Sequence, residues 1–200
     1  MTHVVRFCLV LERITAWPGR VAGWLIPLLT VAVCLSVAAA RLRINEFLRW
    51  SDPVPLFGNS LTVNGMLDLH WHFFTMLVML GGAFALSTNG HVQVDFLSQR
   101  FKPSTQKVIM VLGDVFFLLP FCIFMAWYGW RFTVTSFNMG EGSTYGGLLD
   151  RYFIKAFVPI GFILLGINGV ARSTRVLTEL VSPPAPRQAE QSELRGMRRG

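Results

Sequence analysis

A carboxylate inside a long apolar stretch is the group in this sequence whose position could support chemistry. Asp114 lies within such a stretch, Val108–Trp130. An ionised carboxylate is costly there unless it is paired, protonated or close to a polar boundary. Asp114 could serve a proton or ion relay, or it could bond to a basic residue at the end of another stretch, for example Arg172. Because no second acid lies deep in an apolar stretch, a structural bond is the favoured interpretation.

Two histidines and an aspartate lie where a second apolar stretch begins. His70 and His72 are two residues apart, so on a helix they point to opposite sides and do not readily share a metal ion. Asp68 and His72 are four apart and could face each other, while Trp71 is typical of an interfacial anchor. A bis-histidine haem site needs histidines at similar depth, but His91 is expected at the opposite end of the stretch. The histidines nevertheless leave a haem- or quinone-binding membrane anchor of a redox complex as an alternative hypothesis.

A glycine-rich segment and the cysteines are weaker signals. Gly140-Glu141-Gly142-Ser143 superficially resembles a phosphate loop, but the segment lacks the Gly-Lys-Ser/Thr ending and a preceding strand. It is better interpreted as a turn into the last apolar stretch. No C-x-x-C pair exists, so neither a redox motif nor a zinc site is predicted from the three cysteines, Cys8, Cys34 and Cys122.

Four long apolar stretches must position these residues. About 20 helical residues cross the hydrocarbon core of a bilayer, and in lipid each spanning segment must satisfy its own backbone hydrogen bonds. The sequence therefore predicts an all-α integral membrane protein with four transmembrane helices, at about 21–40, 67–86, 108–130 and 153–170.

The composition leaves little room for a separate soluble domain. Of the 200 residues, 52% are apolar and 14% are charged, which is typical of a single membrane domain. We expect that domain to cover residues 1–180 and a disordered tail to follow over 181–200. The net charge of +7 gathers at the ends of the stretches and in the tail. That distribution is typical of membrane topology, so nucleic acid is not an expected partner.

The basic residues also predict an orientation. With the N-terminus inside, twelve of the 18 Lys and Arg residues are cytoplasmic and six are external. Positive charge is enriched in cytoplasmic loops, so both termini are expected in the cytoplasm. Residues 2–17 place apolar side chains at helical spacing, opposite Arg6 and Arg13, which predicts an N-terminal interfacial amphipathic helix. Pro18 and Gly19 are expected to end that helix.

Other features concern the connections and the third stretch. The longest external segment, Arg41–Met66, contains turn formers and predicts a small hairpin or an irregular cap. Pro120 and Pro159 lie inside spans and are expected to kink them. An aromatic ridge on the third stretch could contact another membrane subunit or lipid: Phe116, Phe117, Phe121, Phe124 and Trp127.

Several short motifs, taken in order, resemble one family. Gly90-His91-Val92-Gln93-Val94-Asp95 is similar to the Gly-His-apolar-Arg-Val-Asp signature of the small, DctQ-like membrane subunit of TRAP (tripartite ATP-independent periplasmic) transporters. Asp68-Leu69-His70-Trp71-His72 resembles the Glu-Leu-Gln-Trp-His segment of one branch. The resemblance covers about residues 20–175 and continues through Gly140-Glu141-Gly142-Ser143, Arg151, Lys155 and Pro159.

Two departures from the family pattern matter. Gln93 stands where Arg is common, which puts any ion pair or lipid-phosphate contact of that Arg in doubt. Asp68 and His70 replace Glu and Gln, which are mild changes. His91 and Asp95 are four residues apart and could bond to each other, as a cap on the cytoplasmic end of the second span.

The resemblance implies a non-catalytic subunit without cofactor or metal. In this family the small subunit binds a larger multi-span permease subunit that carries substrate and sodium ions, and a periplasmic binding protein delivers the substrate, commonly an organic acid. The implied role is a brace for the large permease subunit in a bacterial inner membrane, surrounded by membrane lipid. Besides the redox anchor, a small self-sufficient channel that uses Asp114 is the alternative.

Overall fold

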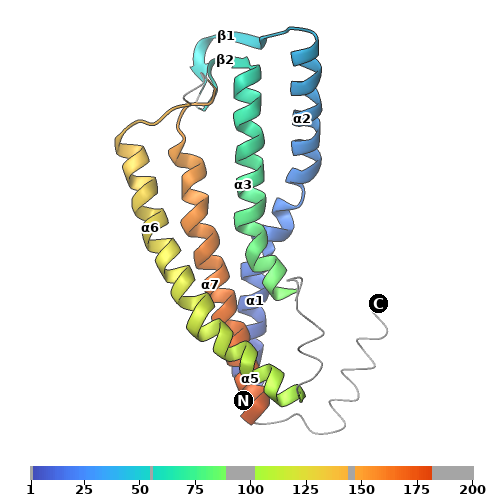
Figure 1. Ribbon diagram of the computed structural model, residues 1–200, viewed down its shortest axis with the longest axis vertical. Helices are drawn as coiled ribbons and strands as arrows, with labels where there is room; N and C mark the ends of the chain where they lie inside the picture. The colour runs from blue at the N-terminus through green and yellow to red at the C-terminus, as the bar shows by residue number, and fades with distance from the viewer. Residues whose placement is uncertain (1, 55, 89–101, 144–146, 182–200) are drawn as a thin grey trace.

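Four long helical segments run side by side in the computed structural model of this protein (Figure 1). It describes residues 2–54, 56–88, 102–143 and 147–181. Within these ranges, four segments are long and apolar enough to cross a membrane: His3–Arg41, Val63–Ser87, Ser104–Asn138 and Tyr152–Val181. The prediction of a mainly helical protein with four candidate membrane spans is confirmed. The predicted tail follows Val181 and lies outside the described residues.

The elements follow each other in a simple order along the chain. They are α1 (Thr2–Ala22), α2 (Leu25–Arg41), β1 (Glu46–Val54), β2 (Gly58–Thr62), α3 (Val63–Ser87), α5 (Pro103–Gly113), the π-helix η1 (Asp114–Leu118), α6 (Leu119–Asn138) and α7 (Tyr152–Val181). The start of α1 and the end of α7 lie at the lower end of Figure 1, and the strands lie at the upper end.

The first helical segment corrects the prediction for residues 2–17. α1 continues through Pro18 to Ala22, and the turn before α2 lies at Gly23-Trp24. α1 packs against α3 and α7 and is part of the candidate span His3–Arg41, so the described residues show no separate interfacial helix. Glycine at position 19 allows this contact, since a Cβ there would lie 2.5 Å from the Leu80 carbonyl oxygen. Close approach at small residues is the usual way in which helices pack in membranes.

The face predicted for α1 is divided between buried and exposed side chains. Phe7 and Ile14, two residues of that face, are 63% and 60% exposed. Cys8 and Thr15, which belong to the same face, are buried, and so is Glu12. The helix thus turns small and polar residues toward its neighbours and its bulky residues outward.

The segment Arg41–Met66 contains a hairpin, one of the two structures predicted for it. β1 pairs with β2 in antiparallel register, with Glu46 opposite Thr62 and Val54 opposite Gly58. The indole Nε1 of Trp50 donates to the Gly58 carbonyl oxygen at 2.6 Å. The hairpin connects α2 to α3, and the hydroxyl of Thr62 accepts from the Gly65 amide to cap α3.

The third helical segment changes its geometry in the middle. The Leu119 amide donates to the Asp114 carbonyl oxygen, five residues back, which defines η1 as a π-helical turn. Pro120 follows immediately and has no N–H to donate. The distortion expected at Pro120 therefore takes the form of a wider turn just before it.

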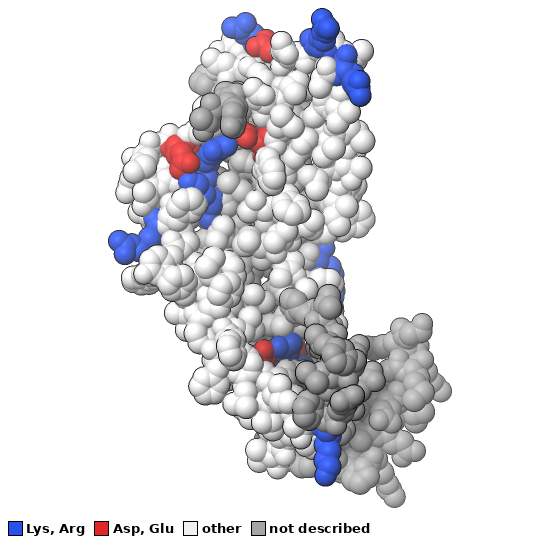
Figure 2. Space-filling view, viewed as in Figure 1, with Lys and Arg blue, Asp and Glu red and all other residues white. Residues whose placement is uncertain are grey.

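The last helix, α7, is the centre of the bundle. It packs on α1, α3, α5 and α6, while α2 packs mainly on α3. α7 continues through Pro159, and Gly161 lies against α3, where a Cβ would be 2.6 Å from the Met79 carbonyl oxygen. Small residues therefore set the helix spacing. Large apolar side chains cover much of the outer surface, which is mostly white in the space-filling view (Figure 2).

Candidate functional site: two polar clusters at opposite ends of the bundle

The first cluster, called here the lower polar cluster for its place in Figure 1, surrounds the first residue of η1. The Asp114 carboxylate is buried, and Oδ2 accepts from Arg172 Nε at 3.0 Å and from Ser173 Oγ at 3.0 Å. Arg172 Nη2 donates to Oδ1. The expected bond between Asp114 and Arg172 is thus confirmed. Three donor atoms from two residues thus satisfy this carboxylate, which suits a structural ion pair.

A second set of polar contacts extends the lower polar cluster to α1 and α5. Arg175 Nε donates to Glu12 Oε1 at 3.0 Å, and Lys107 Nζ lies 2.8 Å from Glu179 Oε2. Asn168, which is fully buried, donates to Thr15 Oγ1 at 2.8 Å. These contacts were not predicted from the sequence. An Asn in an otherwise apolar span was the signal that could have pointed to them, because a buried amide needs a partner.

The second cluster, called here the loop cluster, lies at the opposite end, where the connection between α6 and α7 meets α3. Asp68 Oδ2 accepts from the Leu148 amide at 3.1 Å, and Asp68 Oδ1 lies 3.5 Å from Arg151 Nη2. A Cβ on Gly147 would lie 2.1 Å from Asp68 Oδ2, so glycine is required for this approach. Asp68 therefore anchors the loop to the start of α3.

Glu141 completes the loop cluster. Its carboxylate forms an ion pair with Lys155 and accepts from Ser136 Oγ at 2.8 Å, and its carbonyl accepts from the Arg151 amide at 3.0 Å. Lys155 and then Ser136 hold the pKa of Glu141 below its ordinary value. Lys155 Nζ also lies 4.0 Å from the centre of the Phe132 ring. The predicted residues Glu141, Arg151 and Lys155 are thus brought together, and with Asp68 they shape the loop.

The histidines take different places. His72 is buried, and its Nδ1 donates to the main-chain oxygen of Asp68 at 2.7 Å, so the bond goes to the backbone rather than to the predicted carboxylate. His70 Nε2 lies 3.4 Å from Ser36 Oγ on α2. Trp71 is 68% exposed, as an interfacial anchor would be. In the described part of the chain, no three His, Cys, Asp or Glu side chains gather to hold a metal ion.

Of the remaining residues of the family motifs, some lie in the part of the chain that the structure describes and others lie outside it. Ser143 donates its amide to the Leu148 carbonyl oxygen at 3.0 Å, next to Gly142. Pro159 is buried against Gly129. The whole segment with the Gly-His signature, including Gly90, His91, Gln93 and Asp95, lies outside the described residues.

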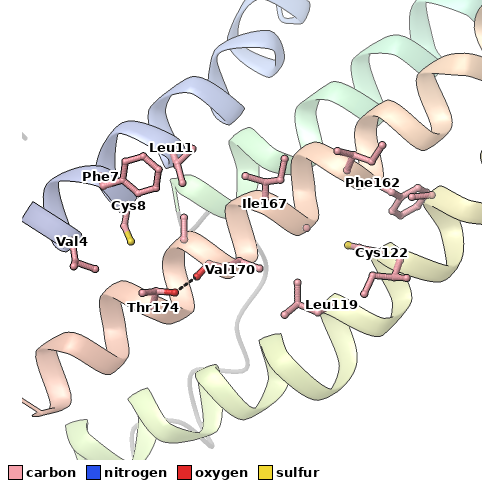
Figure 3. Close-up of a pocket in the computed structure, with 15 residues that line it drawn as sticks. Val4, Phe7, Cys8, Leu11, Leu119, Cys122, Phe162, Ile167, Val170 and Thr174 are labelled. Carbon is pink, nitrogen blue, oxygen red and sulfur yellow. Dashed lines mark hydrogen bonds between the residues drawn. The ribbon is translucent and has the colours of Figure 1, made fainter.

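An apolar groove of about 500 Å³ lies between α1 and α6, with α7 as its floor (Figure 3). Val4, Phe7 and Leu11 line one side, and Leu119 and Cys122 line the other. A polar group in the lining, the Thr174 hydroxyl, donates to the Val170 carbonyl oxygen. An anionic substrate would lose its hydration here without gaining a partner, so this groove suits hydrocarbon rather than an organic acid.

These features define a multi-pass membrane protein whose described polar clusters shape the bundle and its loop. Residues 55–179 match a family model described as the DctQ component of tripartite ATP-independent periplasmic transporters. The match covers more than half of the chain, so the protein belongs to this family and is a transporter component, not an enzyme. No curated protein matches the chain in a sequence comparison. The redox-anchor and self-sufficient-channel hypotheses give way to this assignment. Proteins of this family work with the other TRAP components.

Proposed function

We propose that this chain is the small permease subunit of a TRAP transporter, and that it braces the large permease subunit during sodium-coupled uptake of an organic acid. A periplasmic binding protein would deliver the substrate. The proposal deepens the family assignment, which names the component but neither the substrate nor the coupling ion. In it, residues 1–180 act as one membrane domain, and the packing of α7 against α1, α3, α5, η1 and α6 supports that unity.

The observation that carries the proposal is the large apolar surface of α6 and η1. Phe117 is 79% exposed, and Trp127, Phe124 and Phe116 are 65%, 56% and 67% exposed. Aromatic side chains contribute large contact areas at protein interfaces. Among the described residues, neither the groove nor the polar clusters make a good site for an organic acid. The groove is apolar, and the charged side chains of the clusters pair with one another. A brace needs a broad, rigid contact surface more than it needs a binding site.

The proposed orientation places both termini in the cytoplasm of a bacterium and the hairpin in the periplasm. The start of α1 and the end of α7 share one end of the bundle, as four spans require, and the excess of Lys and Arg supports the cytoplasmic side for that end. A single-cysteine variant of the hairpin, Ser51→Cys, in a chain without native cysteines should react with a membrane-impermeant maleimide in intact cells. Labelling only after lysis would contradict this orientation.

The hairpin is also the proposed receiving surface for the binding protein. β1 and its flanks expose Arg43, Arg49 and Asp52 to solvent. A photo-reactive side chain at Arg49 should cross-link to the binding protein when substrate is present. A binding protein that cross-links to the large permease subunit but never to this position would contradict the receiving role of the hairpin. It would not contradict the proposal that the chain braces the large subunit.

Co-purification tests the brace directly. The tagged chain, extracted from its native membrane in a mild detergent, should elute with a large multi-span permease at fixed stoichiometry. A matched variant that replaces Phe117, Phe124 and Trp127 by leucine keeps the surface apolar but removes its aromatic shape, so recovery of the permease should fall. A wild-type chain that elutes alone, or only with copies of itself, would contradict the proposal.

A further inference from the structure

Below η1, the third helical segment and α7 advance in step. Lys107 pairs with Glu179, and Asp114 pairs with Arg172. Each helix advances seven residues between these two pairs. Seven residues correspond to two turns of a helix in a supercoiled pair, so the lower half has ordinary helix packing.

Above η1, the two helices again advance in step. A Cβ added at Gly166 would lie 3.3 Å from the Cβ of Cys122, and one added at Gly129 would lie 3.2 Å from Pro159 Cδ. From Cys122 to Gly129 and from Gly166 back to Pro159, each helix advances seven residues. The upper half therefore has the same ordinary packing as the lower half.

Across η1, the two helices do not advance in step. The third segment uses eight residues between Asp114 and Cys122, whereas α7 uses six between Arg172 and Gly166, or seven when counted from Ser173, which also bonds Asp114. Over the same length, the third helical segment therefore contains two residues more than α7 when α7 is counted from Arg172. Counted from Ser173, the excess is one residue, as expected for a single-residue insertion. The hydrogen bond from the Leu119 amide to the Asp114 carbonyl skips that additional residue.

We propose that η1 is a one-residue insertion locked in place by Asp114 through Arg172 and Ser173, so that α5 and α6 hold separate registers on α7. Without the lock, the wide turn can relax to an α-helix. One residue of an α-helix corresponds to a rotation of about 100°, so α6 would turn its aromatic face about its own axis. The ion pair thus sets the direction in which α6 presents Phe124 and Trp127. This inference does not depend on the identity of any partner.

A disulfide can report the register of α6. The Cβ separation of 3.3 Å at Gly166 and Cys122 is close to the separation in disulfides, about 3.8 Å, and the Cys122 sulfur points toward α7 (Figure 3). The reporter chain carries Gly166→Cys together with Cys8→Ala and Cys34→Ala. Copper phenanthroline oxidises the two thiols in native membranes, and a maleimide that adds mass to free thiols measures the cross-linked fraction on a gel.

Four variants of the reporter chain test the lock. Deletion of Phe117, whose side chain is 79% exposed, removes the inserted residue and should leave cross-linking within twofold of the parent. Insertion of an alanine after Phe117 is the matched control and should abolish cross-linking. The pair Asp114→Asn and Arg172→Gln, which leaves no uncompensated charge, should lower cross-linking about fivefold, the ratio that corresponds to roughly 1 kcal/mol. Adding the Phe117 deletion to that pair should restore cross-linking.

Any of the following three results would overturn the proposal. Loss of cross-linking on deletion of Phe117 would mean that the wide turn is not an insertion. Unchanged cross-linking in the neutralised pair would mean that Pro120 holds the turn without the ion pair. Failure of the deletion to rescue the neutralised pair would mean that Asp114 acts on general folding rather than on register.

Discussion

The lower polar cluster and the loop cluster use the same chemistry in different surroundings. Each contains a carboxylate, a basic side chain and a hydroxyl. At Asp114 and Arg172 the side chains are 7% and 12% exposed inside a candidate span, whereas the Glu141 side chain is 38% exposed in a loop. A charged side chain within the membrane cannot be solvated by water when its ion-pair partner is lost. The lower polar cluster is therefore expected to govern the stability of the bundle, and the loop cluster the shape of one connection.

The largest effect is expected at Arg172. Replacing it by alanine leaves the buried Asp114 carboxylate without its ion-pair partner, which costs about 3–5 kcal/mol when such a pair is broken on one side. Unfolding in a titration with sodium dodecyl sulfate, followed by helical circular dichroism, measures the loss. The neutralised pair Asp114→Asn and Arg172→Gln is the control and should lose clearly less. An Arg172→Ala chain as stable as the wild type would remove the stabilising role assigned to the cluster.

A smaller effect is expected between the two clusters, at the contact of α7 with α3. Gly161→Ala places a Cβ 2.6 Å from the Met79 carbonyl oxygen, and overpacking of this kind costs about 1–3 kcal/mol. Gly81→Ala on α3 is the matched control, because no atom lies within 4 Å of its added Cβ. The same detergent titration compares them. If both variants unfold at the same point, helix spacing is not set by Gly161.

In the loop cluster, Asp68→Ala should open the loop without unfolding the bundle. The Leu148 amide loses its acceptor, and a buried donor left without a partner costs about 1–3 kcal/mol. Hydrogen exchange at Leu148 should accelerate, while exchange in α7 stays as in the wild type. Asp68→Asn keeps an acceptor oxygen and should exchange more slowly than Asp68→Ala. Accelerated exchange throughout α7 would show that the two clusters are not separable.

The smallest effect is a pH dependence of the loop. Because the pKa of Glu141 is lowered in the folded chain, its contribution is fully present above the ordinary Glu pKa and is lost as pH falls through the lowered pKa. Protection of the Arg151 amide, which donates to the Glu141 carbonyl, should therefore stay constant above the ordinary Glu pKa, begin to fall in the ordinary Glu range and be lost as pH falls through the lowered pKa. In Glu141→Gln that acid transition should disappear. An unchanged transition in this variant would assign the pH dependence to another group.

The sequence predicted the spans, the hairpin and the pair of Asp114 with Arg172, because each depends on local composition or on the cost of a charge in lipid. It also predicted the motif residues of the loop cluster through the family resemblance. It did not predict that α1 packs on α3 and α7, because an apolar stripe does not reveal whether it faces lipid or a helix. The close approach that Gly19 allows is seen only in the folded chain. The π-helical turn was not predictable, because the additional residue is defined only against α7.

Photo-cross-linking at Trp127 tests whether the exposed face of α6 contacts a larger membrane subunit, as proposed above. A benzophenone side chain replaces Trp127, and a second chain carries it at Val37, which is exposed on α2, for comparison. After illumination of native membranes, we expect an adduct of this chain with a large multi-span permease from position 127. Adducts at position 127 with lipid alone, or with another copy of this chain, would contradict it.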